Sequence, residues 1–196
     1  MSILIAGLVL FWGTHALRMV VPAWRERMMA RLGLALWRVL VSIVSLLSVV
    51  LICWGFVQAR LVARFLWVPP FWTRYAAALL MLLAFVLLAS YFVPRNAIKI
   101  RSRYPATLSV AVWAWAHLLA NGKTVDMVLF GAFLAWAVWD LAVLRRQERT
   151  RLDTGLPATA LGTGLAIIAG VIGWALFMLG LHPWLMGVAP FPSLTF

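Results

Sequence analysis

Six long apolar runs constrain the fold of this chain more than any other feature. They cover residues 2–20, 39–57, 72–93, 106–120, 125–144 and 160–181. A run of about 20 apolar residues can cross the hydrocarbon core of a bilayer as an α-helix. A transmembrane β-barrel would instead show short strands of alternating polarity, which this sequence lacks. The runs therefore predict an all-α, polytopic membrane helix bundle with about six transmembrane helices.

Composition supports the same interpretation. Hydrophobic residues make up 65% of the chain and charged residues only 11%, against about 25% charged residues in typical soluble domains. The first run is retained as a span because its charges follow the apolar stretch, whereas a signal peptide has them in front. The fourth run, after Pro105 and before Asn121, is short for a full crossing. We predict a single transmembrane domain over residues 1–196.

The basic residues predict which side of the membrane each connection faces. The net charge is +12, but these charges lie between spans and form no soluble basic face, so nucleic acid is not an expected partner. Lys and Arg favour cytoplasmic loops. This bias places the odd-numbered connections in the cytoplasm and both termini on the periplasmic face. The odd-numbered connections hold 13 of the 17 basic residues, namely Arg18, Arg25, Arg27, Arg31, Arg38, Arg95, Lys99, Arg101, Arg103, Arg145, Arg146, Arg149 and Arg151.

A few polar side chains within the spans are the candidate functional residues. Inserting a charged group into a bilayer costs at least a few kcal/mol, so such residues are functional candidates by default. His15, Arg18, His117 and Asp140 are the main ones. Asp126 is expected to begin the fifth helix, where the helix dipole favours a carboxylate. His182, beside Pro183, is expected at the interface.

Two inward histidines on different spans can hold a haem iron between their imidazoles. Gly7 and Ala114 are small residues on the helix faces of His15 and His117, and we expect them to leave room for a bulky, flat group. At 1.5 Å per residue, His15 lies about 20 Å from the outer end of its helix and His117 about 6 to 9 Å from its outer end. The depths of the two histidines therefore differ by about 10 Å or more. Either tilted helices bring both histidines to one shared site, or each histidine belongs to a site of its own. The structural alternative is that each histidine bonds a backbone carbonyl, lies near an interface or forms an interhelical hydrogen bond.

Arg18 and the tryptophans extend this hypothesis. Arg18 can pair with a haem propionate or with Asp140, or it can reach to the headgroups. Four tryptophans lie deep in their spans and are expected either to wall a flat or polyene ligand or to fill the core, namely Trp113, Trp115, Trp136 and Trp139.

Small residues four positions apart predict close helix packing. They are Gly162 with Ala166 and Gly170, and Gly131 with Ala135. No phosphate loop, zinc helix or nucleophile elbow occurs.

Two motifs in order resemble those of a known family. The opening LVLFWGTHALRMV resembles the LxLFxxxHxxR start of NnrU-type membrane proteins. The stretch YPATLSVAVWAWAHLLANGKTVDMVLFGAFLAW is similar to that family's second signature, a proline followed by WxxxHLxxNG and an FGxF stretch. The resemblance covers most of the first five spans.

The resemblance implies a location, a cofactor and a role. NnrU proteins are associated with denitrification, and the family is similar to the plant 15-cis-zeta-carotene isomerase, a membrane enzyme that uses haem b with histidine ligation. His15 and His117 are then the implied iron ligands, in a multi-pass protein of the bacterial inner membrane. Family members commonly read RHP where this chain has Tyr104 between Arg103 and Pro105. The isomerase has a cysteine three residues before its second histidine, where this chain has Ala114, so ligand exchange through that thiol is excluded.

Three functional hypotheses follow. The first is an NnrU-type protein that binds haem b through His15 and His117, with Arg18 and Trp113 beside the cofactor, and supports nitrite and nitric-oxide metabolism. The second is a haem-dependent isomerase of a hydrophobic polyene, with a lipid-facing entrance beside Trp113 or Trp115. The third is a non-enzymatic assembly partner of a respiratory complex. Whether the chain is an enzyme is left open.

Overall fold

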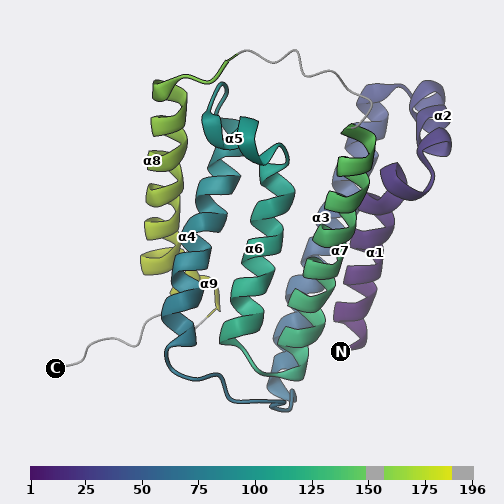
Figure 1. The fold of residues 1–196 in the computed structure, drawn as a ribbon. Helices are drawn as coiled ribbons and strands as arrows, with labels where there is room; N and C mark the ends of the chain where they lie inside the picture. Colours follow the sequence, from purple (N-terminus) through teal and green to yellow (C-terminus); the bar gives the residue numbers. More distant parts are fainter. Residues whose placement is uncertain (149–156, 187–196) are drawn as a thin grey trace. The chain divides into compact units, whose positions relative to one another are not determined.

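The computed structural model describes residues 1–148 and 157–186, which form helices with connecting segments and contain no β-strand (Figure 1). The all-α prediction is confirmed. Arg149 and Arg151, which the charge count includes, lie outside the described residues. The helices are α1 (Ser2–Val20), α2 (Pro22–Leu32), α3 (Leu34–Leu61), α4 (Thr73–Phe92), α5 (Ala97–Ser102), α6 (Pro105–Ala120), α7 (Thr124–Glu148), α8 (Ala160–Leu176), the π-helical η1 (Phe177–Leu181) and α9 (His182–Met186).

Each of the first five predicted spans corresponds to one helix, and the sixth corresponds to α8 together with η1. In the described part of the chain, five helices are long and apolar enough to cross a membrane: α1, α3, α4, α7 and the stretch Ala160–Met186. Helix α6 is apolar but has only 16 residues, a length of about 24 Å against about 30 Å for the bilayer core. Five candidate membrane spans are therefore shown. The number six and the sides of the two termini stay predictions.

Two short helices lie in connections for which no helix was predicted. Helix α2 begins at Pro22, whose fixed φ suits the first helical position. It ends at Gly33, whose φ of +78° ends the helix before α3 begins. Helix α5 begins after Asn96, whose side chain accepts a hydrogen bond from the backbone N–H of Lys99 (2.7 Å). Residues at the helix ends therefore determine where α2 begins and ends and where α5 begins.

The described chain forms two compact units. The first comprises Met1–Trp67 and Lys123–Ala132, and the second comprises Val68–Gly122 and the described residues from Phe133 onward. Helix α7 supplies its first part to one unit and the rest to the other. That residues 1–196 act as a single domain stays a prediction.

In the first unit, α1 packs along α3 (Figure 1). Two glycines make the close approach. A Cβ on Gly7 would lie 2.8 Å from the backbone nitrogen of Ile52, and a Cβ on Gly55 would collide with the backbone of Leu4. Small residues at such contacts let helix backbones approach closely within a bilayer. The room that we expected Gly7 to leave for a ligand is therefore taken by α3, and that part of the prediction is wrong.

The first unit also joins the end of α3 to the start of α7. Phe65 and Lys123 form an isolated antiparallel bridge, and the Lys123 ammonium lies 5.1 Å from the centroid of the Phe65 ring. Asp126 lies in the first turn of α7, and its carboxylate accepts a hydrogen bond from the Lys123 backbone N–H (3.2 Å). The predicted place of Asp126 at the start of that helix is confirmed.

In the second unit, α4 contacts both α6 and α8 (Figure 1). The face of α8 that carries Gly162, Ala166 and Gly170 is buried. A Cβ on Gly170 would lie 2.5 Å from the Cα of Val86 on α4. The packing prediction for this face is confirmed. For Gly131 it is wrong, because a Cβ there would meet no atom of the described residues within 4 Å.

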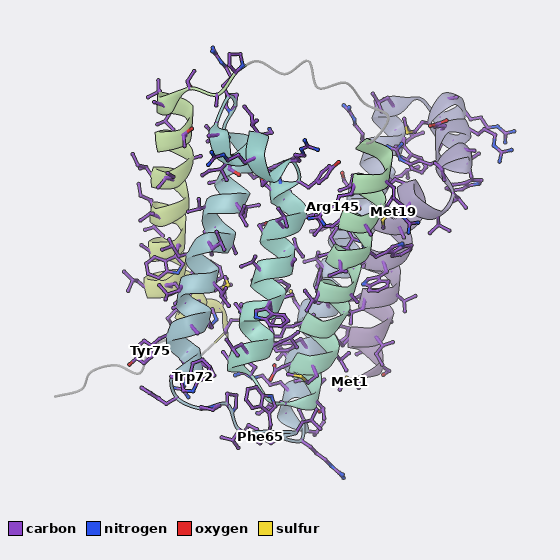
Figure 2. The ribbon with its side chains drawn as sticks, in the orientation of Figure 1. Met1, Met19, Phe65, Trp72, Tyr75 and Arg145 are labelled. Atoms are coloured by element: carbon purple, nitrogen blue, oxygen red, sulfur yellow. The ribbon has the colours of Figure 1, made fainter. Side chains whose placement is uncertain are left out.

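Aromatic residues mark the start of α4. Figure 2 shows the Trp72 and Tyr75 side chains extending outward at this end of the helix, and they are 61% and 50% exposed. Trp and Tyr favour the membrane–water interface because their rings are apolar and their N–H or O–H groups are polar. Their exposure suits a position at that interface.

Candidate functional site

His15 lies in the second half of α1 and is half-buried. Its Nδ1 is 2.9 Å from the carbonyl oxygen of Phe11, one turn earlier. The Phe11 ring stacks on the imidazole, with 4.0 Å between the ring centroids and 18° between the ring planes. The backbone bond and the stacked ring together restrict the orientation of the imidazole.

His117 lies in the last turn of α6 and is also half-buried. Its Nδ1 is 2.9 Å from the carbonyl oxygen of Trp113, again one turn earlier. The Trp113 ring is tilted by 50° to the imidazole, with 5.3 Å between centroids, and Phe133 of α7 meets that indole edge-on. The Asn121 amide donates a hydrogen bond to the His117 carbonyl oxygen (2.9 Å) and satisfies a group at the helix end.

The two histidines therefore share one local arrangement. A carbonyl oxygen can only accept a hydrogen bond, so Nδ1 must be the donor in both residues. In the neutral imidazole this leaves the lone pair on Nε2. Histidines that bind metal ions almost always donate their other ring N–H in this way, which fixes the tautomer and the ring orientation. Both residues therefore have the local backbone hydrogen bond that metal-binding histidines commonly have.

The predicted cofactor residues group by unit. Arg18 is on α1 with His15 in the first unit, and Trp113 is on α6 with His117 in the second. A site shared by His15 and His117 stays a prediction. No group of three or more His, Cys, Asp or Glu side chains among residues 1–148 and 157–186 forms a metal site. Haem ligation by two imidazoles needs only two such side chains, so the absence of a group of three from the described residues does not test it.

Arg18 and Asp140 have different surroundings. Arg18 is exposed in the last turn of α1, where a positive charge complements the helix dipole. Asp140 is completely buried and its carboxylate accepts a hydrogen bond from the Thr107 hydroxyl (2.9 Å), which joins α7 to α6. Because Arg18 and Asp140 belong to different units, their predicted pairing stays a prediction.

The four deep tryptophans divide into two groups. Trp136 is buried and Trp113 half-buried, whereas Trp115 and Trp139 are 57% and 37% exposed. Trp113 also lines an apolar cavity of about 210 Å³ in the second unit. Ser109 is the single polar side chain in this lining, and its hydroxyl donates to the Ala106 carbonyl oxygen (2.7 Å). The cavity walls are Met81, Ala84, Phe85, Leu88, Ser109, Val110, Trp113 and Phe177.

Sequence reasoning placed His182 at the interface and gave it no role. In the structure His182 begins α9, directly after the π-helical η1, and its ring meets Phe177 edge-on with 5.9 Å between centroids. It also lies close enough to His117 for the two side chains to interact electrostatically. The proline that follows it in sequence gave no indication of this neighbour, because the interaction joins distant parts of the chain.

Comparison with known proteins decides the family. The family model described as NnrU protein matches residues 3–190, nearly the whole chain. The chain belongs to the NnrU family. No curated protein and no solved structure matches it. His15 and His117 both lie within the matched residues.

Proposed function

We propose that this NnrU-family chain binds haem b through His15 and His117 and supports nitrite and nitric-oxide metabolism in the bacterial inner membrane. The observation that carries the proposal is the repeated local arrangement of the two histidines. Each donates its Nδ1–H to the carbonyl oxygen one turn earlier. Each therefore offers Nε2, the nitrogen that ligates iron in a neutral imidazole.

Neighbouring residues fit the same role. The Phe11 ring restricts the rotation of His15, and Trp113 lies against His117, so both imidazoles keep their orientation at little entropic cost on binding. Arg18, one turn after His15, offers a guanidinium that can bind a propionate through charge-assisted hydrogen bonds. The bound haem would supply an iron centre for electron transfer or for Lewis-acid chemistry.

The first experiment is an oxidised-minus-reduced absorption spectrum of the detergent-purified chain after expression with ample haem. We expect a stoichiometric b-type signal. His15→Ala and His117→Ala should each lose or shift it, and added imidazole should restore part of the signal by replacing the missing ligand. His182→Ala is the matched control, because this histidine is near His117 but lies outside the proposed ligand set.

The outcomes separate the ligand sets. Loss of signal in His117→Ala and His182→Ala, with His15→Ala unchanged, would move the site into the second unit and contradict the role of His15. A colourless wild-type protein would contradict haem binding altogether and favour the role of an assembly partner of a respiratory complex.

The metabolic role has a test of its own. A denitrifying strain without this chain should accumulate nitrite or nitric oxide. The wild-type chain should correct this accumulation, and His117→Ala should not.

One observation favours a second candidate function, the isomerisation of a hydrophobic polyene. The apolar cavity lined by Trp113 lies beside the residue that contacts His117. At about 210 Å³ it is larger than the roughly 150 Å³ cavity that binds benzene in a model protein. It is smaller than the roughly 300 to 1,000 Å³ typical of complete ligand pockets, so it would take one segment of a longer chain. A changed isomer profile of a carotenoid in a heterologous host is the test.

A further inference from the structure

Helix α2 differs from the two long helices of the first unit, α1 and α3. It is 11 residues long and has no buried residue, and at about 16 Å it cannot cross a bilayer. It connects α1 to α3, two candidate spans that pack along each other. A helix in that connection must lie at the membrane face where both spans end.

Two tryptophans join α2 to α3. The ring of Trp24 meets Trp37 edge-on, with 6.1 Å between centroids and 71° between planes. Trp24 remains 41% exposed. Indoles favour the headgroup level of a membrane, because the ring is apolar and its N–H is polar. This pair therefore places α2 at the depth of the lipid headgroups.

Apolar and basic side chains lie beside each other on α2. At 100° per residue, Trp24, Met28 and Leu32 form one row along the helix at four-residue steps. Arg27 and Arg31, also four residues apart, form the adjoining row, and both are exposed. Trp and Leu next to arginines on a short helix are typical of helices that lie in the membrane interface, where the rings meet the acyl boundary and the guanidinium groups reach the headgroups.

The two arginines repel each other when no anion is bound. Like charges four residues apart destabilise a helix, and Glu26 forms no ion pair with either arginine in the described part of the chain. The Arg27 Nε donates only a long bond to the Ala23 carbonyl oxygen (3.3 Å). A phosphate between the two guanidinium groups would remove the repulsion and accept charge-assisted hydrogen bonds from both.

We infer that α2 is an interfacial helix whose Arg27 and Arg31 bind the phosphates of anionic phospholipid headgroups. The tryptophan pair sets the depth of the helix, and the arginine pair selects the charge of the lipid. The inference does not depend on haem, because none of these four residues belongs to the proposed cofactor site.

The test is equilibrium binding of fluorescent phosphatidylglycerol and phosphatidylcholine, with matched acyl chains, to the detergent-purified full chain. Each basic residue near an anionic surface contributes about 1 kcal/mol, so we expect the two arginines to make the wild type prefer phosphatidylglycerol by about thirtyfold. Arg27→Gln/Arg31→Gln should lose most of this preference. Arg64→Gln/Arg74→Gln, an equal change of charge at two exposed arginines elsewhere, should keep it.

Two further measurements make the result decisive. The preference of the wild type should disappear at about 1 M salt, where the Debye length is about 3 Å. This arm needs no variant and so holds even if a substitution impairs folding. An unchanged preference in Arg27→Gln/Arg31→Gln would overturn the inference. Displacement of phosphatidylglycerol by inorganic phosphate would also overturn it, because the site would then take a soluble anion.

Discussion

Gly55 gives a sharp prediction at the scale of one residue. A Cβ at this position would collide with the backbone of Leu4, and backbone atoms of a packed helix cannot move aside as a flexible side chain can. Gly55→Ala should therefore force α1 and α3 apart and lower the free energy of unfolding by about 1–3 kcal/mol. Thermal unfolding of the purified chain in detergent would show this as a reduced Tm.

Gly13 is the matched control on α1. No atom of the described residues lies within 4 Å of a Cβ placed there. Because alanine is the better helix former, Gly13→Ala should leave the Tm unchanged or raise it, by up to about 1 kcal/mol of stability. Equal losses in the two variants would mean that helix packing at Gly55 is not the cause.

The candidate functional residues could be selected from sequence because a polar group is costly inside a bilayer. His15, His117 and Asp140 were singled out on that ground alone. A bond from each imidazole to a backbone carbonyl was one of the alternatives that the sequence offered, and the structure shows it at Phe11 and Trp113. Which ring nitrogen and which carbonyl take part could not be predicted, since both depend on the rotamer that each imidazole adopts. Gly7 was misinterpreted because a glycine looks the same in sequence whether it makes room for a ligand or for a neighbouring helix.

At the scale of the elements, Asn96 joins the end of α4 to the start of α5. It is completely buried, and its amide donates to the carbonyl oxygens of Ser90 (2.9 Å) and Val93 (2.6 Å) while its side-chain oxygen caps α5. Asn96→Ala would leave buried polar groups without partners. We expect a loss of about 2 to 4 kcal/mol in the free energy of unfolding, measured as a lower Tm.

Ser102, in the last turn of the same short helix, is the comparison. Its hydroxyl is buried and has no hydrogen-bond partner within residues 1–148 and 157–186. Ser102→Ala should therefore be neutral or slightly stabilising, because it removes a polar atom that no bond compensates. A loss as large as that of Asn96→Ala would show that any change in this connection is harmful, and would contradict the capping argument.

Helix ends were predictable where a proline or a polar pair marks them, and less so elsewhere. The edges of α1 and α6 lie within a residue of the apolar runs. Helices α2 and α5 were missed, because short polar helices have no long hydrophobic period. Arg95 and Arg103, on either side of α5, have φ values of +52° and +62°. Arginine seldom adopts this conformation, so nothing in the sequence indicates it.

At the scale of the whole molecule, the number of spans decides where the termini lie. Helix α6 decides this number, since its 16 residues are fewer than a typical span needs. If it crosses, six spans place both termini on the same side, and the basic connections put that side in the periplasm. If it does not cross, five spans place the termini on opposite sides.

Reporter fusions distinguish these cases. We expect alkaline phosphatase joined to the C-terminus, or inserted between α3 and α4, to be active, because both positions face the periplasm in the six-span topology. A fusion between α4 and α6 should be inactive, since it faces the cytoplasm. An inactive C-terminal fusion with an active one between α3 and α4 would show that α6 does not span the membrane.

Which spans pack together was beyond prediction. All six runs are apolar, so composition does not distinguish the partners of α4 from those of α3. The packing partner of a helix depends on where its small residues lie, as the contacts of Gly170 with Val86 and of Gly7 with Ile52 show. The sequence indicated the small residues of α8 but not the helix that they face.

The first unit is discontinuous along the chain, and this has a consequence for synthesis. Helices α1 and α3 can meet as soon as both have left the ribosome, but Lys123–Ala132 is made only after the whole stretch Val68–Gly122. The Phe56 ring therefore has no edge-on partner until this later segment is made, because that partner is Phe130. The centroids of the two rings are 6.5 Å apart. A chain arrested before Lys123 would expose an unfinished surface, the kind that membrane insertases and quality-control proteases recognise.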